Sequence, residues 1–327
     1  MSMGTRARIA TVSQDGKFKR DVEGNREYVL GLLNRALLEK PDLVCLPEAF
    51  HDVGVTKPVS ETAESLSGPT IEVISREARR ARCFVICPIH TREEGRIFNS
   101  AVLIGRDGEV AGVYHKACPV TGSADYTKLE EDITPGDSAP VFDLDFGRVG
   151  IQICFDVGFP ENWQALADAG ARIVFWPSAY DGGFPLRAYA YTHHYFVVSS
   201  TRTGTSRIID PCGEILRETS ETEPVIVRDI NLDYVVSHWD WNMGIPDRIR
   251  AKYGDRVTVR QWDTGSAHFV VEPVDPALKC SDLQDEFGFE STAQYHERHR
   301  RAYQQIRAGE RPTPQEARHG DRPQWGK

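Results

Sequence analysis

Residues 149–161 read VGIQICFDVGFPE, and the rest of the chain is best interpreted outward from this stretch. A run rich in β-branched residues ends at Cys154, a short turn follows, and Pro160 is placed to open a helix. A side chain at such a strand-to-helix corner faces the rim of a sheet, and the nearby helix N-terminus favours a thiolate. The stretch predicts a nucleophilic Cys154; the alternative is a small buried cysteine at a strand end.

The composition excludes several classes of protein. The chain has 327 residues, 40% hydrophobic and 27% charged, which is enough for a sizeable buried core. A formal net charge of -9 argues against binding nucleic acid or an anionic membrane surface. No apolar run is long enough to span a membrane, and the first residues lack the apolar core of a secretion signal.

The cysteines and histidines indicate a compartment and argue against a metal. The seven cysteines are scattered without a C-x-x-C pair, so we expect free thiols in a reducing cytoplasm. The ten histidines form no H-x-x-x-H or H-E-x-x-H array, so we expect no metal site. These patterns together predict a cytoplasmic protein.

Apolar strands and amphipathic helices alternate over the first two thirds of the chain. Helices are expected where apolar residues recur at helical spacing, at residues 29–37, 70–81 and 160–169. Strands are expected at residues 7–12, 43–46, 84–89, 99–104, 110–114, 142–144, 148–153, 173–176, 195–200, 207–216 (a hairpin) and 224–230. This order predicts an α/β fold.

Two segments repeat one pattern. Residues 43–50 read LVCLPEAF and residues 173–180 read IVFWPSAY, and both follow a helix. Each is an apolar strand that ends in proline, a polar residue, alanine and an aromatic residue. The repeat predicts two equivalent halves related by a pseudo-twofold axis, with both proline corners on the same rim.

The pattern changes near residue 233. We therefore expect a core domain at 1–232, a C-terminal extension at 233–308 that either completes the domain or contacts a partner subunit, and a flexible tail at 309–327. The extension begins with an aromatic segment at 238–242 and contains a basic helix at 295–306. From residue 297 onward there are eight Lys or Arg against four Asp or Glu. This part is either a solvated helix and loose tail or an arm that packs on a partner subunit.

Three reactive side chains stand at the ends of predicted strands: Glu48, Lys116 and Cys154. Alone, the glutamate and the lysine would be ordinary surface charges. They lie, however, within an ordered set of motifs at 46–50 (LPEAF), 114–116 (YHK), 135–137 (PGD) and 154–161 (CFDVGFPE). This set resembles the nitrilase, or carbon–nitrogen hydrolase, superfamily over about residues 7–230.

The resemblance implies a four-layer αββα sandwich with a Glu-Lys-Cys site. Glu48 would be the general base, Lys116 the electrostatic stabiliser and Cys154 the nucleophile. A second glutamate that orients the lysine would be Glu130, with Glu131 as the alternative. The family usually forms dimers or larger homo-oligomers, and the reaction needs no metal or organic cofactor.

The chemistry suits these residue types. A free cysteine is mostly thiol at neutral pH, so Glu48 must take its proton. We expect burial to raise the pKa of Glu48 for this task. The oxyanion formed on attack would be received by Lys116 and by the backbone N–H of Phe155.

The turn after the cysteine resembles the amidase and N-carbamoyl hydrolase branches. It favours a linear amide or ureido substrate over a nitrile; the alternatives are a nitrile hydrolase and a catalytically silent binding protein. One departure is residues 189–193, YAYTH, where the family often has Arg-Ala-x-Glu-Asn. If the two halves are related by the pseudo-twofold axis, we expect five side chains to line the pocket: Phe50, His51, Phe159, Ser178 and Tyr180. The alternative is that these side chains only pack at the rim of the sheets.

Overall fold

The computed structural model describes residues 5–261 and 267–316, except for the side chain of Glu131. The chain divides into two compact units, Met1–Ile230 and Asn231–Lys327. Of the predicted tail at 309–327, residues 317–327 lie outside the described residues. Each unit is described by itself below.

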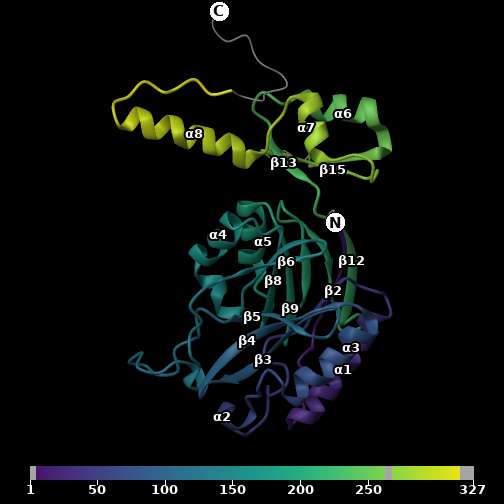
Figure 1. Ribbon diagram of the computed structural model, residues 1–327, viewed down its shortest axis with the longest axis vertical. Coiled ribbons are helices and arrows are strands. Elements are labelled where there is room, and N and C mark those ends of the chain that lie inside the picture. The colour runs from purple at the N-terminus through teal and green to yellow at the C-terminus, as the bar shows by residue number, and fades with distance from the viewer. Residues whose placement is uncertain (1–4, 262–266, 317–327) are drawn as a thin grey trace, which may run out of the picture. The chain divides into compact units, whose positions relative to one another are not determined.

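The first unit contains two six-stranded sheets (Figure 1). The first sheet has the order β12-β1-β2-β3-β4-β5. Its strands are β1 (Arg6–Val12), β2 (Leu43–Cys45), β3 (Phe84–Glu93), β4 (Arg96–Ile104), β5 (Val110–His115) and β12 (Val225–Asn231). Strands β1, β2 and β3 are parallel, whereas β4 and β5 continue the sheet as an antiparallel meander.

The second sheet has the order β11-β10-β9-β8-β7-β6. Its strands are β6 (Val141–Leu144), β7 (Gly147–Ile151), β8 (Ile173–Ser178), β9 (Phe196–Thr201), β10 (Arg207–Ile209) and β11 (Ile215–Glu218). Strands β7, β8 and β9 are parallel, and the others pair antiparallel. The two sheets contact each other at β1 and β9, where the Thr11 hydroxyl donates to the Ser199 carbonyl at 2.6 Å.

Helices cover the outer face of each sheet (Figure 1). α1 (Val22–Leu37) and α3 (Pro69–Ala81) lie on the first sheet, and α4 (Pro160–Asp168) and α5 (Gly183–His193) lie on the second. The Asp21 side chain caps α1 by accepting from the Gly24 N–H at 2.7 Å. The buried stripe of α1 has the predicted spacing and consists of Asn25, Val29, Leu32, Leu33, Ala36 and Leu37. The predicted four-layer αββα sandwich is confirmed.

The predicted pseudo-twofold is visible in the order of the elements. The first half runs β1-α1-β2-α3-β3-β4-β5, apart from the short helix α2 (Val59–Thr62), and the second runs β7-α4-β8-α5-β9-β10-β11. Each sheet gains one extra strand at the equivalent edge, β12 beside β1 and β6 beside β7. The repeated proline corners therefore follow β2 and end β8, at matching places in the two halves.

One element escaped the sequence interpretation. Residues 183–193 form α5, although no helix was predicted there. Only Leu186 and Ala190 of this helix are buried, and two glycines, Gly182 and Gly183, begin it with positive φ. A helix with so narrow a buried stripe gives a weak periodic signal. In addition, β3 and β4 extend up to their shared turn and are longer than predicted.

The second unit has a core of its own. β13 (Val235–His238) and β14 (Val257–Arg260) both pair antiparallel with β15 (His268–Pro273). The remaining elements are α6 (Ile245–Tyr253), the 3-10 helix η3 (Gly254–Arg256), α7 (Cys280–Phe287) and α8 (Thr292–Arg307). Phe269 and Phe289 lie at 0% exposure in this core. Helix α8, capped by Ser291, confirms the predicted basic helix.

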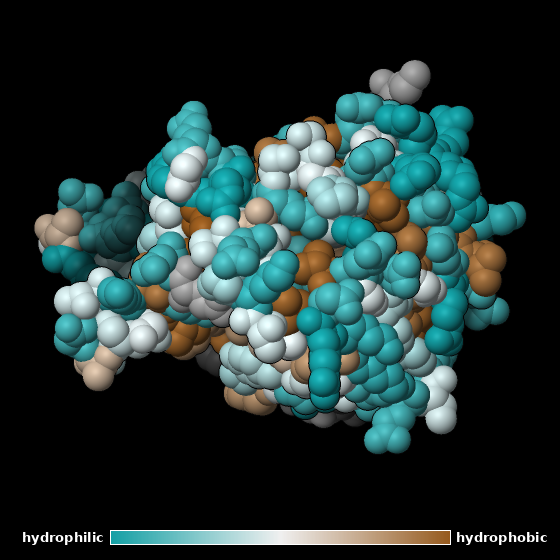
Figure 2. Space-filling model, turned by 90° about the horizontal axis from the view of Figure 1, so that it is seen from below, coloured by the Kyte–Doolittle hydropathy of each residue, from teal (hydrophilic) through white to brown (hydrophobic). Residues whose placement is uncertain are grey.

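The surface in Figure 2 is covered mainly by hydrophilic residues, and the hydrophobic ones lie in small separate groups. Within residues 5–261 and 267–316, no helix is long and apolar enough to cross a membrane.

Candidate active site

Four predicted side chains converge at the carboxyl ends of the parallel strands and beside the end of β5. Glu48 follows β2, Lys116 follows β5, Cys154 follows β7, and Glu130 opens the 3-10 helix η1 (Glu130–Asp132). Lys116 Nζ lies 3.2 Å from Glu48 Oε1 and 2.7 Å from Glu130 Oε1. Glu48 is 2% exposed, Lys116 1% and Cys154 8%. One lysine therefore bridges two carboxylates in a nearly dry site, and the glutamate predicted first, Glu130, makes the contact.

The cysteine stands on a strained corner. Cys154 has a φ of 47°, in the left-handed region that a side chain rarely adopts, and it begins the 3-10 helix η2 (Cys154–Gly158). The Asp156 carboxylate holds this corner, since it accepts from Ile153 N–H at 2.7 Å, Cys118 N–H at 2.9 Å and the Tyr114 hydroxyl at 2.7 Å. Such strain persists only where the surroundings fix the backbone, and here Asp156 fixes it.

Glu48 is held from both sides. Oε1 accepts from Asn99 Nδ2 at 2.8 Å in addition to Lys116, whereas Oε2 faces Arg202, whose Nη2 lies 3.5 Å away. The residue after it, Ala49, has a φ of 42°. The backbone thus turns sharply after Glu48 as it does at Cys154.

The proline-glycine motif at 135–136 fixes the lysine backbone. The Gly136 N–H donates to the Lys116 carbonyl at 2.9 Å, and the Lys116 N–H donates to the Asn99 carbonyl at 2.8 Å. A Cβ at Gly136 would lie 2.3 Å from the His115 carbonyl oxygen. A glycine is therefore required there because only it permits this close backbone approach.

The titration of the base differs from the expectation. Burial does act to raise the pKa of Glu48, but Lys116, Arg202 and Asn99 together outweigh it, so the pKa is lowered. The prediction of a raised pKa was wrong because it counted the desolvation and not the two cations. Burial also acts to lower the pKa of Lys116, yet its neighbouring carboxylates and Cys154 raise it.

The cysteine is a thiol in the resting site. Burial and the Glu48 charge raise the pKa of Cys154 to about 11, against the opposing effect of Lys116. The expectation that the N-terminus of the helix opened by Pro160 would favour a thiolate is therefore wrong for the resting state, because burial of the thiol and the charge of Glu48 raise the pKa. A thiol with a raised pKa needs a base to take its proton if it is to act as a nucleophile.

Two donors were predicted to receive the oxyanion. Lys116 is one of them. The backbone N–H of Phe155 lies in the first turn of η2, where a helix leaves its amides without intrahelical acceptors. The arrangement fits an oxyanion site beside the thiol.

Two of the predicted lining residues, Ser178 and Tyr180, lie near the thiol, and a third, Phe159, contacts the residue after it. The Ser178 side chain and the Ala179 main chain act to lower the pKa of Cys154, and the charges of Cys154, Glu48 and Lys116 act on the pKa of Tyr180. Phe159 meets Phe155 edge to face, with ring centroids 5.6 Å apart.

The other two predicted lining residues pack elsewhere. Phe50, at 0% exposure, belongs to the core cluster beneath α1 and α3. His51, also at 0% exposure, packs against Phe50 and His90. Their predicted place in the pocket is not supported, because the chain turns at Ala49 and takes them to the helix side of the first sheet.

Several groups in the site escaped the sequence interpretation. Asn99 and Arg202 contact Glu48, and Tyr114 holds Asp156. In the departing segment at 189–193, Tyr189 stacks on Trp163 at 4.3 Å and donates to the Val157 carbonyl at 2.8 Å. The departure thus supports the turn after the cysteine. A polar residue next to a predicted strand end was the available signal for Asn99 and Arg202.

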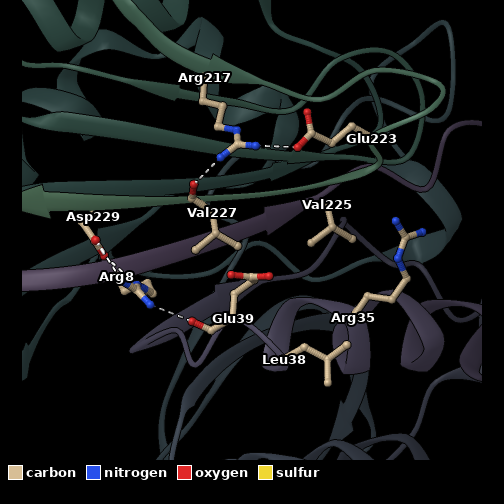
Figure 3. Close-up of a pocket in the computed structure, with 9 residues that line it drawn as sticks. All are labelled: Arg8, Arg35, Leu38, Glu39, Arg217, Glu223, Val225, Val227 and Asp229. Carbon is tan, nitrogen blue, oxygen red and sulfur yellow. Dashed lines mark hydrogen bonds and ion pairs between the residues drawn. The ribbon is translucent and has the colours of Figure 1, made fainter.

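A separate pocket of about 520 Å³ opens between β11, β12 and the end of α1 (Figure 3). Arg8 is paired with Asp229, and Arg217 with Glu223. None of the predicted catalytic residues lines it. Its lining is Arg8, Arg35, Leu38, Glu39, Arg217, Glu223, Val225, Val227 and Asp229.

Comparisons with known proteins agree with this fold. The sequence model of the family described as carbon-nitrogen hydrolase matches residues 6–238. Omega-amidase NIT2-B of Xenopus laevis is 28% identical over 226 residues, which is 62% of this chain and 82% of the relative.

Solved structures share the fold. Nit3 of Saccharomyces cerevisiae, a member of branch 10 of the nitrilase superfamily, superposes with a TM-score of 0.61 at 20% identity, covering 71% of this chain and 92% of Nit3. An amidase from Nesterenkonia sp. gives a TM-score of 0.61 at 22% identity, covering 70% and 92%.

Proposed function

The chain belongs to the carbon–nitrogen hydrolase family, and from this membership we propose that it hydrolyses a linear amide or N-carbamoyl compound through a thioester on Cys154. The observation that carries the proposal is the buried Lys116 bridging Glu48 and Glu130 beside the cysteine corner. Relatives named omega-amidase favour an amide as the substrate class. We propose Glu48 as general base, Lys116 as oxyanion stabiliser, Glu130 as the residue that orients the lysine, and Cys154 as nucleophile.

The first half of the reaction forms the thioester. Cys154 Sγ adds to the substrate carbonyl carbon while its proton passes to Glu48. Oε2 suits this transfer, because Oε1 already accepts from Asn99 and Lys116. Lys116 and the Phe155 N–H stabilise the oxyanion, and Glu48 then gives the proton to the departing nitrogen as the C–N bond breaks.

The second half regenerates the enzyme. Water attacks the thioester carbonyl and gives its proton to Glu48. The C–S bond breaks, the acid is released, and the cysteine recovers its proton from Glu48. An ionised Glu48 and a neutral Cys154 are the protonation states with which this cycle begins, and the directions of their pKa shifts support them.

We also propose that the enzyme is a cytoplasmic homo-oligomer. All seven cysteines are free thiols, which suits a reducing compartment. On α5, Phe184 is 74% and Tyr191 41% exposed, and exposed aromatic side chains of this kind favour association. Light scattering of the purified chain tests the assembly; a strictly monomeric mass would contradict it.

The test compares matched substrates. Ammonia release is measured with butanamide, propylurea and butyronitrile, and the quenched enzyme is examined by mass spectrometry for an acyl group on Cys154. We expect release from the amide or the ureido compound in preference to the nitrile, and an acyl adduct in the wild type. The Cys154→Ala variant should be inactive, while Cys212→Ala, in the turn between β10 and β11, serves as the control. Full activity of Cys154→Ala would overturn the proposal.

A further inference from the structure

Arg202 is a charged group in the active site that the proposed mechanism does not use. It follows β9, its side chain is 22% exposed, and Nη2 lies 3.5 Å from Glu48 Oε2. This distance suits an ion pair rather than a good hydrogen bond. A guanidinium carries five N–H donors, and within the described part of the chain Glu48 is the one side-chain partner of Arg202. Most of these donors are thus available to a ligand.

The two cations differ in how far they are neutralised. Lys116 contacts two carboxylates, those of Glu48 and Glu130. Among the side chains that the structure describes, Arg202 contacts only the Glu48 carboxylate, which also pairs with Lys116. The two oxygens of Glu48 divide accordingly, with Oε1 towards Lys116 and Oε2 towards Arg202. An additional carboxylate would therefore be bound more strongly by Arg202 than by Lys116.

The backbone of Arg202 is bonded to the segment that neighbours the thiol. The backbone N–H of Arg202 donates to the Ser178 carbonyl at 2.9 Å, and the backbone N–H of the next residue, Thr203, donates to the Ala179 carbonyl at 3.2 Å. Ser178 and Ala179 both act on the pKa of Cys154, so they lie close to its thiol. Arg202 thus contacts both Glu48 and a residue that neighbours the thiol.

A second polar group lies next to this segment. Gln14 follows β1 and is 0% exposed; its N–H donates to the Thr201 carbonyl at 2.9 Å, and Gly16 N–H donates to the Arg202 carbonyl at 2.9 Å. Among the described residues, neither Nε2 nor Oε1 of Gln14 has a hydrogen-bond partner. Burying such an amide unpaired is costly, and a ligand that pairs with it would account for its presence.

We propose that Arg202 and Gln14 form a subsite that binds a carboxylate carried by the substrate, so that the preferred amide or ureido compound is an anion. The proposal rests on the proposed function. Arg202 binds the carboxylate through paired N–H donors, and Gln14 Nε2 donates to the same group. On binding, Arg202 exchanges part of its contact with Glu48 for the substrate, which leaves Oε2 free to accept the thiol proton.

The test uses pairs of substrates that differ only in the carboxylate. Succinamate is compared with butanamide, and N-carbamoyl-β-alanine with propylurea, by kcat/KM for ammonia release. We expect the anion to be preferred by about 10- to 100-fold in at least one pair. In Arg202→Gln this ratio should fall towards one, mainly through KM, and Arg202→Lys should restore part of it. Arg35→Gln, an exposed arginine of α1, is the control with the same change in charge and should leave the ratio unchanged.

The pH profile separates this role from a structural one. Arg202 helps to lower the pKa of Glu48, so the acid limb for the neutral amide should move to higher pH in Arg202→Gln. If Arg202→Gln lowers kcat/KM for both members of a pair equally, Arg202 acts only on Glu48 or on the fold, and the subsite is wrong.

A binding measurement tests the subsite even if the protein hydrolyses none of the substrates. Succinamate and N-carbamoyl-β-alanine are titrated calorimetrically into Cys154→Ala and into the double variant with Arg202→Gln. Binding in the first and its loss in the second support the subsite even if no substrate is hydrolysed, in which case the proposed function alone fails. Equal binding by the two variants, or binding by neither, overturns the subsite.

Gln14 is tested by Gln14→Leu. Removing a buried, unpaired amide should leave the midpoint of thermal unfolding unchanged or higher, while the affinity for the anion falls by about 3- to 10-fold. An unchanged affinity in a stably folded variant would remove Gln14 from the subsite.

Discussion

The two halves of the sandwich follow the same plan but carry different chemistry. Glu48 and Ser178 occupy the same place in the repeated corner, one after β2 and the other at the end of β8. Both are buried, Glu48 at 2% and Ser178 at 0% exposure. In the first half this place holds a charge that pairs with Lys116, and in the second a neutral hydroxyl that contacts Cys154. The shared scaffold fixes where side chains stand, and the residue types decide what they do.

The difference extends to the other strand ends. The first half contributes the carboxylate and ammonium groups of Glu48 and Lys116, whereas the second contributes the thiol of Cys154 and the guanidinium of Arg202. Neither half could carry out the reaction alone. The site therefore depends on the packing of one sheet on the other as much as on either sheet.

Substitutions at the two equivalent corners should differ most in their effect on kcat. Glu48→Gln removes the proposed general base while keeping its shape, and we expect kcat to fall by about 10²- to 10⁴-fold. Ser178→Ala removes only a contact to the thiol, so we expect a loss below about 10-fold. Steady-state rates on one amide measure both. Comparable losses would mean that the two corners share the chemistry.

The second contrast is between a buried ion pair of the first half and an exposed one of the second. Lys116→Met leaves Glu48 buried without its ammonium partner, and we expect a loss of about 3–5 kcal/mol in the free energy of unfolding at neutral pH. Arg148→Met breaks an exposed pair with Asp143, whose side chains are 42% and 61% exposed, and should cost about 1 kcal/mol or less.

Urea denaturation at pH 7 measures both losses. The loss in Lys116→Met should shrink on acidification, because protonation of Glu48 removes the unpaired charge. A loss in Lys116→Met no larger than that in Arg148→Met would contradict the assignment of the buried pair.

Two tyrosines, one from each half, hold the turn after the cysteine. Tyr114 donates to the Asp156 carboxylate, and Tyr189 to the Val157 carbonyl. Because the first acceptor is a carboxylate, Tyr114→Phe should cost about 1.5–3 kcal/mol of unfolding free energy, and Tyr189→Phe about 0.5–1.5 kcal/mol. Urea midpoints give the order, and kcat should follow it. A reversed order would show that α5, not β5, is the main support of the corner.

The smallest effect is expected from mild acid. The lowered pKa of Glu48 means that its carboxylate stays ionised below the ordinary range, and the thiol of Cys154 stays neutral because its pKa is raised to about 11. Because the pKa of Glu48 is lower in the folded than in the unfolded protein, its ionisation stabilises the fold at pH values above the ordinary carboxyl pKa of about 4.3. This stability is lost as the pH falls through the pKa of Glu48 in the folded protein. We expect kcat/KM at pH 5 within about twofold of that at pH 7 for a neutral amide, because neither group titrates between these values. A limb centred near pH 6 would contradict it.

Much of the fold could be predicted because the strands carry strong signals. The apolar runs before Pro47 and Pro177 and the stripe of α1 have the periods of their structures, and the repeat revealed the halves. α5 could not be predicted, because only two of its residues are buried and its sequence lacks an apolar stripe.

The candidate site could be predicted only in part from the sequence, for a different reason. Glu48, Lys116 and Cys154 were marked by residue type at strand ends, but Arg202 stands in a polar loop like many other arginines, and its reach to Glu48 depends on the packing of two sheets. The sign of the Glu48 shift depended on the same packing. Burial was evident from sequence, whereas the number of cations facing the carboxylate was not.

The burial of Cys154 has a consequence for survival under oxidative stress. Peroxides attack thiolates far more readily than thiols, and reaction requires access to the sulfur. Cys154 is 8% exposed and neutral while the site is empty. Low exposure and a neutral thiol thus both shield the sulfur from sulfenic acid formation.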